Sequence, residues 1–216
     1  MRHIAIVGSG PAGYYTAEAA VKKWGEDARI DVFDKLPVPF GLIRTGVAPD
    51  HQSIKAVARR YEKTAIGDTV RFVGNVAVGE DITIAELGDL YDAMVLATGA
   101  PVDRALPIAG AEADNVIGSA AFVGWYNGHP EFAALDPQLS GKHAVVVGGG
   151  LLGLEAANGL MLRGMQVTVV HISPWLMERQ LDEVAGKMLQ KSLEDRGLKF
   201  MIGDARPAIG ESARRL

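Results

Sequence analysis

The 216-residue chain contains no cysteine, and this absence excludes several classes of chemistry at once. Without thiols the protein forms no disulfide bonds and offers no thiolate ligands to a metal ion, so we predict no metal site. The paired cysteines through which disulfide reductases pass electrons are missing as well. Any redox chemistry must therefore be carried by a bound cofactor.

Long runs of one kind of residue are also missing. The formal net charge is only -4 and no long basic run occurs, so nucleic acid is not an expected partner. No apolar stretch approaches the ~20 residues that span a bilayer, and no hydrophobic signal segment precedes the first strand pattern. We therefore expect no membrane association and a cytoplasmic location.

Glycine, by contrast, is abundant, with 26 residues, and much of it falls in two fingerprints that each follow an apolar run. Their glycines are Gly8, Gly10 and Gly13 after residues 4–7, and Gly148, Gly150 and Gly153 after residues 144–147. The G-x-G-x-x-G spacing lets a strand turn tightly into a helix, which brings backbone N–H groups up to a pyrophosphate. Two such motifs predict two bound dinucleotides, the pattern of a flavoprotein that takes hydride from a nicotinamide cofactor.

Hydrophobic periodicity predicts an α/β fold with two Rossmann-like dinucleotide-binding units in series, of the FAD/NAD(P)-binding type, the second one shortened. The first should contain strands at 3–7, 30–33, 70–73, 77–78 and 93–97, and helices at 11–24 and 52–65. The second should contain a strand–helix–strand unit from 143 to 172, a helix at 182–196 and a strand at 198–202. We assign residues 1–105 to the first unit and residues 106–216, with a connector and a short polar tail, to the second. The family resemblances given below imply that the first is the FAD-binding-type unit and the second the NAD(P)-binding-type unit.

The residue that ends the second strand of each unit is a candidate ligand for the cofactor's ribose. Asp34 lies about 20 residues beyond the first set of glycines, where an acid binds a ribose 2′-OH. The alternative is a solvated loop acid beside Lys35, and the spacing favours ribose. The second unit has His171 at this place, which either stacks on adenine, contacts a 2′-phosphate or simply ends a strand. His171 therefore does not decide between NAD and NADP.

His51 and Glu155 are the two candidate catalytic residues. Glu155 follows the last glycine of its motif by two positions, in the predicted first turn of a helix. There it either faces the nicotinamide or only complements the helix dipole. His51 either carries protons near a flavin or marks the edge of the next helix, with Asp50 as the cap.

Residues 1–140 resemble the adrenodoxin reductase family of ferredoxin–NADP reductases. The loop 37–51 carries this similarity, together with segments 96–100 and 122–128. The resemblance implies FAD at the first fingerprint, with Asp34 on the ribose, Gly41 and Leu42 near the flavin, and proton handling by His51. The cofactor-binding residues of this unit are then Gly8, Gly10, Pro11, Ala12, Gly13, Asp34, Lys35, Gly41, Leu42, Thr98 and Gly99.

From about residue 141 to residue 202 the chain is similar instead to the NAD(P)H domain of nitrite reductase large subunits and rubredoxin reductase-like enzymes. Segments 148–155, 167–171 and 176–182 carry this resemblance. It implies that NAD(P)H binds at the second fingerprint. The residues implied are Gly148, Gly150, Leu151, Leu152, Gly153, Glu155 and His171.

Both families continue beyond this point and return to the flavin domain, whereas residues 203–216 match neither. We therefore expect FAD to be held sub-stoichiometrically. We also expect exposed sheet edges that favour a homodimer.

These features predict an NAD(P)H-dependent flavin oxidoreductase that passes hydride from nicotinamide to FAD and on to a small-molecule or protein acceptor. Two alternatives remain. One is a flavin-free NAD(P)H-dependent reductase of a small molecule, although no Tyr-x-x-x-Lys pair supports it. The other is a truncated, non-catalytic dinucleotide-binding protein.

Overall fold

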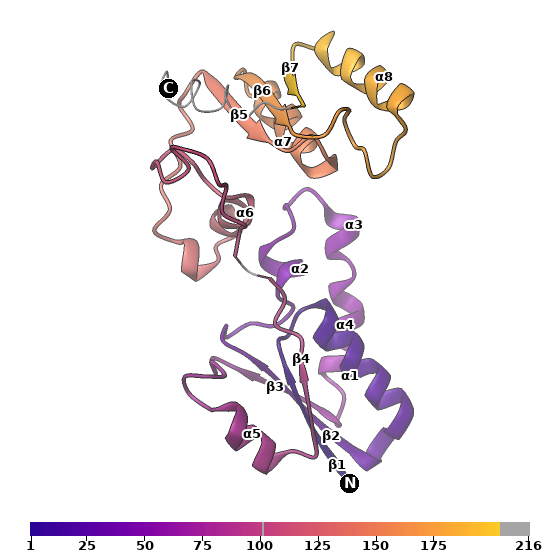
Figure 1. The fold of residues 1–216 in the computed structure, drawn as a ribbon. Coiled ribbons are helices and arrows are strands. Elements are labelled where there is room, and N and C mark those ends of the chain that lie inside the picture. Colours follow the sequence, from indigo (N-terminus) through magenta and orange to yellow (C-terminus); the bar gives the residue numbers. More distant parts are fainter. Residues whose placement is uncertain (101, 204–216) are drawn as a thin grey trace. The chain divides into compact units, whose positions relative to one another are not determined.

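The computed structural model describes residues 1–100 and 102–203, which fold as two compact units (Figure 1). The first unit comprises Met1–Arg104 and Ile117–Leu135, and the second comprises Ala105–Val116 and the chain from Asp136 onward. This division differs from the sequence-based boundary in residues 117–135, which pack with the first unit. The physical reason is a set of side-chain hydrogen bonds, accepted by Asp103 and donated by Asn127.

A parallel sheet of four strands, in the order β3-β2-β1-β4, forms the centre of the first unit. Its strands are β1 Arg2–Val7, β2 Ala28–Asp34, β3 Val70–Gly74 and β4 Ala93–Leu96. The register places Val7 opposite both Phe33 and Leu96, so β1, β2 and β4 end at the same edge. Continuous apolar runs form these strands because a parallel sheet is buried on both faces.

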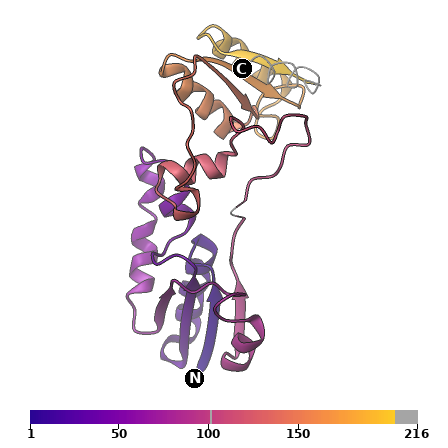
Figure 2. The same cartoon turned by 90° about the vertical axis from the view of Figure 1, so that its left-hand side faces the viewer.

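Helices cover both faces of this sheet, as Figures 1 and 2 show. Helix α1, Pro11–Trp24, packs against the face that carries Ile6, Ile30 and Val32. Helix α5, Ile84–Leu90, places Leu87 against the opposite face. Sequence periodicity missed α5, although Thr83 and Glu86 form a capping box at its start. The strand predicted at 77–78 is reduced to an isolated bridge between Val78 and Ile82.

The segment predicted as one helix over 52–65 is broken in two. Helices α3, Gln52–Lys55, and α4, Ala58–Ala65, are separated by Ala56 and Val57. Here the N–H of Val57 donates to Ile54 at 3.2 Å and the N–H of Arg60 to Val57 at 2.9 Å, the tighter i→i−3 pattern. The remaining short elements of the unit are α2 Leu42–Thr45, α6 Ser119–Tyr126 and the 3₁₀ turns Gly25–Asp27 and Pro130–Phe132.

The second unit repeats the strand–helix–strand pattern on a smaller scale. Its parallel strands, in the order β5-β6-β7, are β5 His143–Val147, β6 Gln166–His171 and β7 Lys199–Ile202. Helices α7, Leu151–Leu162, and α8, Glu183–Glu194, pack on the single face that carries Val146, Val169 and Phe200. Asp182 caps α8 by accepting the N–H of Ala185 at 2.8 Å. Among the described residues, β5 has no strand on its other side, whereas β1 has β4 there.

No helix in the described ranges is long and apolar enough to cross a membrane.

Candidate dinucleotide-binding sites

The first fingerprint forms a tight turn between β1 and α1. Gly8 has a φ of +112°, a conformation that glycine adopts without steric cost, and its N–H donates to the carbonyl of Phe33 at 2.8 Å. A methyl group at Gly8 would lie 2.3 Å from the carbonyl oxygen of Ala97. The turn therefore lies against the ends of both neighbouring strands, β2 and β4, and Thr98 and Gly99 follow Ala97 just beyond β4.

The other two glycines of this motif have opposite surroundings. A Cβ at Gly13 would lie 2.0 Å from the carbonyl oxygen of Gly8, so the helix can approach the turn this closely only with glycine. A Cβ at Gly10 would meet no protein atom within 4 Å. Gly10 is the N-cap of α1 and Pro11 the first helical residue, so the unpaired N–H groups of the first helical turn begin at Ala12. The glycine spacing thus leaves open space in front of a helix N-terminus, where an anion is favoured.

The loop 37–51 closes over this turn from one side. The N–H of Phe40 donates to the carbonyl of Ser9 at 3.1 Å, and a Cβ on Gly41 would lie 3.0 Å from the Cα of Gly10. Phe40 has a φ of +88°, which is strained for a residue with a side chain. Its ring is buried against Tyr14, with the ring centroids 5.2 Å apart.

Asp34 ends β2 and binds the turn. Its Oδ2 accepts the backbone N–H of Ser9 at 3.1 Å and also the Ser9 hydroxyl, while Oδ1 accepts the N–H of Leu36 at 2.9 Å. A carboxylate offers about four acceptor positions, so Oδ1 keeps one for a further donor. Ser9 is fully buried by this contact, and sequence reasoning missed it although it lies inside the motif.

The other predicted site residues of the first unit have separate surroundings. Lys35 forms an ion pair with Glu131, and Leu42 is largely exposed at the start of α2. His51 is the N-cap residue of α3, and its backbone carbonyl accepts the N–H of Lys55 at 3.1 Å. Helix α3 has no side-chain cap, so the expectation that Asp50 caps this helix is wrong.

The C-terminal end of helix α6 binds the loop 37–51 through Asn127, a residue that sequence reasoning did not assign to the site. The Asn127 side-chain amide donates to the carbonyls of Thr45, Val47 and Val123 at 3.3, 3.1 and 3.1 Å. The start of α6 is held by Asp103, whose carboxylate accepts the N–H of Ala120 at 2.9 Å. Nothing local in the sequence marks the contacts of Asn127 with Thr45 and Val47 or those of Asp103 with α6, because these partners are 16 or more residues apart.

The second fingerprint repeats the first in its backbone. Gly148 has a φ of +124° and donates its N–H to the carbonyl of Val170 at 2.8 Å. A Cβ at Gly153 would lie 2.0 Å from the carbonyl oxygen of Gly148, and one at Gly150 would meet nothing within 4 Å. Leu151 and Leu152 begin α7 with exposed side chains. This turn therefore presents the same open helix N-terminus.

His171 takes the place of Asp34 in the second unit, and it is buried with 6% of its surface exposed. Its Nδ1 accepts the N–H of Gly149 at 3.1 Å. Its Nε2 lies 3.0 Å from the carbonyl oxygen of Trp175 and 3.1 Å from Glu178 Oε2. The pKa of Glu178 is lowered, mainly because the backbone N–H of Glu178 donates a hydrogen bond to its own carboxylate. The Glu178 carboxylate therefore acts as an acceptor here. The ring of His171 therefore contacts the glycine turn and the loop after its strand, and the interpretations in which it binds a coenzyme stay predictions.

Glu155 lies one turn further along its helix than the sequence predicted. Helix α7 begins at Leu151 after the N-cap Gly150, and its first turn carries no acid. Glu155 is the fifth residue of the helix and is exposed. The expectation that it complements the helix dipole from the first turn is therefore wrong, because the helix begins before the last glycine.

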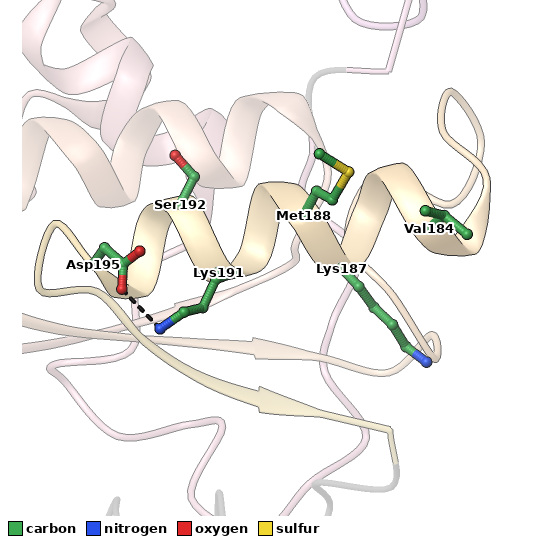
Figure 3. Close-up of a pocket in the computed structure, with 6 residues that line it drawn as sticks. All are labelled: Val184, Lys187, Met188, Lys191, Ser192 and Asp195. Carbon is green, nitrogen blue, oxygen red and sulfur yellow. Dashed lines mark hydrogen bonds and ion pairs between the residues drawn. The ribbon is translucent and has the colours of Figure 1, made fainter.

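A shallow hollow, widely open to solvent, follows the outer side of α8 (Figure 3). Its lining consists of Val184, Lys187, Met188, Lys191, Ser192 and Asp195. Lys191 forms an ion pair with Asp195 at 2.8 Å across one helical turn. All six residues belong to α8 or its C-cap and none is a predicted site residue, so this hollow is separate from the glycine turns.

The profile of one known family matches residues 2–212, that of the pyridine nucleotide-disulphide oxidoreductases. The chain belongs to this family. Its parallel sheets and paired glycine turns confirm the predicted Rossmann-like α/β class. The family's name refers to a disulfide, yet these 216 residues contain no cysteine.

Two curated relatives are similar to most of this chain. NADPH-ferredoxin reductase FprA of Mycobacterium leprae is 46% identical over 165 residues, which are 74% of this chain and 36% of the relative. Human mitochondrial NADPH:adrenodoxin oxidoreductase is 48% identical over 158 residues, 73% of this chain and 32% of the relative. The chain thus spans about a third of the length of these relatives. These similarities confirm the resemblance to the adrenodoxin reductase-type ferredoxin–NADP reductases.

Solved structures agree with this assignment. Mycobacterium tuberculosis FprA in complex with NADPH superposes with a TM-score of 0.74 at 40% identity, over 80% of this chain and 44% of that one. A second FprA structure reaches a TM-score of 0.78 at 32% identity, over 93% of this chain and 59% of that one. The resemblance of residues 141–202 to nitrite reductase-type domains stays a prediction.

Proposed function

We propose that this chain binds FAD at the first fingerprint and NAD(P)H at the second, and works as an NAD(P)H-dependent oxidoreductase. The observation that carries the proposal is the repeated backbone geometry of the two glycine turns. Each ends at a helix N-terminus, and each leaves the space before its middle glycine, Gly10 or Gly150, open to a pyrophosphate. FprA and adrenodoxin oxidoreductase, which are similar over about three quarters of this chain, carry NADPH in their names.

The residues of the first unit fit a bound dinucleotide. The open space before Gly10 receives the pyrophosphate, with the backbone N–H groups of α1 as donors. Asp34 accepts a ribose hydroxyl with its remaining Oδ1 position. Gly41, Leu42, Thr98 and Gly99 then lie around the rest of the cofactor, and Lys35 stays paired with Glu131.

In the second unit the pyrophosphate of NAD(P)H lies before Gly150, on the N-terminus of α7. Gly148 and Gly153 would shape the turn that holds it, and Leu151 and Leu152 begin the helix behind Gly150. When bound, FAD would supply the ability to accept hydride from NAD(P)H and pass electrons on. His51 would hold or release a proton at its imidazole, and Glu155 would face the nicotinamide.

We further propose a ferredoxin-type iron–sulfur protein as the electron acceptor. The names of both curated relatives, one a ferredoxin reductase and the other an adrenodoxin oxidoreductase, support this class over a small molecule. We also propose that the chain forms a homodimer, through a face of the second unit that is discussed below.

A pair of matched variants tests the two binding sites. Gly10→Val should weaken FAD binding by about 30-fold or more, since two or more backbone contacts at ~1 kcal/mol each are lost. Gly150→Val should weaken NADPH in the same way and leave FAD unchanged. Both variants should keep the parent's melting temperature, because a Cβ at either position would meet no protein atom within 4 Å. Flavin absorbance and NADPH fluorescence titrations measure the two affinities on one sample.

The reverse pattern, with NADPH lost in Gly10→Val, would exchange the two assignments. A colourless chain that oxidises NADPH without added FAD would favour a flavin-free reductase. A chain that binds neither dinucleotide would refute the proposal.

A further inference from the structure

The residue that ends the second strand of each unit is bonded to the glycine turn beside it. In the first unit the N–H of Ser9 donates to Asp34, and in the second the N–H of Gly149 donates to Nδ1 of His171, both at 3.1 Å. Each donor is the residue after the first glycine of its motif. The same contact therefore recurs with a carboxylate in one unit and an imidazole in the other.

The partners of His171 define its tautomer. Nδ1 faces an N–H donor, so it carries no proton. Nε2 faces two acceptors, the Trp175 carbonyl and the Glu178 carboxylate, so it carries the ring's proton. Both ring nitrogens are thus engaged within the protein, and neither is left for a coenzyme.

The ring and the turn also fit each other in size. A Cβ at Gly149 would lie 2.7 Å from Cγ of His171 and 2.6 Å from Cδ2 of Leu176. At the corresponding place the first unit has Ser9, which bonds the smaller Asp34 with its hydroxyl. The second unit thus pairs Gly149 with His171 where the first unit pairs Ser9 with Asp34. The larger imidazole fits because Gly149 has no side chain.

We propose that His171 is a positioning residue, which holds the second glycine turn in shape for NAD(P)H and does not contact the coenzyme's 2′ substituent. This inference rests on the proposed function of the second fingerprint. An acid at the end of this strand would pair with the ribose 2′-OH and select NAD. His171 is turned toward the Gly149 N–H instead, so the strand end does not distinguish NADH from NADPH.

Two substitutions separate positioning from direct contact. His171→Asn keeps an acceptor oxygen for the Gly149 N–H and should keep both coenzyme affinities within about 3-fold of the parent. His171→Leu removes the acceptor and should weaken NADH and NADPH alike, by about 10-fold or more. The ratio of the two dissociation constants should stay within about 3-fold in both variants. A ratio that changes by ten-fold or more in either variant would show that His171 contacts the 2′ substituent and would overturn the proposal.

The ring's protonation supplies a second readout that needs no coenzyme. In a ¹⁵N-labelled chain, two-bond ¹H–¹⁵N spectra should show Nδ1 of His171 without a proton and Nε2 with one, assigned by loss of the signals in His171→Asn. These signals should keep the same tautomer when NADPH is added. A proton on Nδ1 in the free chain, or a change of protonation on NADPH binding, would overturn the proposal.

These measurements distinguish a failure of the proposed coenzyme site from a failure of the proposed role of His171. If the parent binds neither coenzyme, the proposed function of this site fails, and the spectrum of the free chain still decides whether His171 bonds to the turn. If His171→Leu does not fold, His171→Asn and the spectra remain decisive. Unchanged FAD binding at the first unit serves as the control for folding.

Discussion

Tyr14 follows the last glycine of the first fingerprint and lies under the site with 1% of its surface exposed. Its ring stacks on Tyr61 at a centroid distance of 5.6 Å and meets the edge of Phe40. Its hydroxyl has no hydrogen-bond partner among the described residues. Burial, and to a smaller extent the charge of Asp34, raises the pKa of Tyr14 to about 12. The Tyr14 ring thus stabilises the core by packing, whereas its buried hydroxyl, without a hydrogen-bond partner, destabilises the fold.

We expect Tyr14→Phe to stabilise the free protein by about 1 kcal/mol at neutral pH, because it removes the unsatisfied hydroxyl and keeps the ring. Urea unfolding measures this difference. A destabilised variant at pH 7 would show that the hydroxyl has a partner after all.

The same pair of proteins should respond differently to alkali. The folded pKa of Tyr14, about 12, lies above the ordinary tyrosine value of 10.0, so the neutral phenol favours the folded state. This stabilisation is complete below pH 10 and is lost as the pH rises through 12, at up to ~1.4 kcal/mol per pH unit. Between pH 10 and 12 the parent should therefore lose stability faster than Tyr14→Phe. Parallel pH profiles would contradict the assignment.

At the scale of elements, the loop 37–51 depends on a helix that lies far from it in the sequence. Few regular hydrogen bonds hold this loop, since it contains only the single-turn helix α2 and no strand. Asn127, the C-cap residue of α6, donates three hydrogen bonds, two of them to the loop carbonyls of Thr45 and Val47. The loop in turn bonds to Ser9 through Phe40, so α6 supports the first glycine turn indirectly.

Asn127→Ala should therefore loosen the loop without unfolding the unit. We expect faster proteolysis within residues 37–51 and FAD binding weakened by about 10-fold, from hydrogen bonds of ~1 kcal/mol each. Limited proteolysis with mass spectrometry locates the cleavage, and flavin titration measures the affinity. Asn115→Ala, at an exposed position of the second unit, is the matched control and should change neither. Equal proteolysis of both variants would show that Asn127 does not hold the loop.

At the scale of the whole molecule, the two sheets differ in how they are covered. Helices lie on both faces of the first sheet, whereas α7 and α8 share one face of the second. The opposite face of β5 carries Val145 and Val147, which are 37% and 48% exposed. Exposed apolar surface of this kind favours association, and a second copy of the chain is the partner we propose.

Val145→Lys should weaken the homodimer by about 10-fold or more, because a charge would have to be buried in the contact. Sedimentation velocity over a range of concentrations measures the dissociation constant. Val184→Lys on α8, where the parent valine is 69% exposed, is the matched control and should leave the dimer unchanged. A parent chain that is monomeric at every concentration would refute the homodimer, and an equal effect of both variants would place the contact elsewhere.

The sequence alone was sufficient for the framework of both units. Buried apolar runs predicted β1, β2 and β6, and Pro11 after Gly10 marked the start of α1 at its observed residue. The glycine spacing predicted both turns, because a positive φ at Gly8 and the close approach at Gly13 are local requirements that other residues do not meet. These features depend on neighbours a few residues apart, so a linear pattern contains them.

What the sequence could not show depends on segments that meet only after folding. The break between α3 and α4, the Asp103 cap on α6 and the Asn127 contacts to the loop involve no repeating pattern. His171 stood in the position of a ribose ligand, and only the folded structure turns its ring toward Gly149. Side-chain hydrogen bonds are short and directional, so their partners are decided by which distant backbone groups the packed core brings within reach.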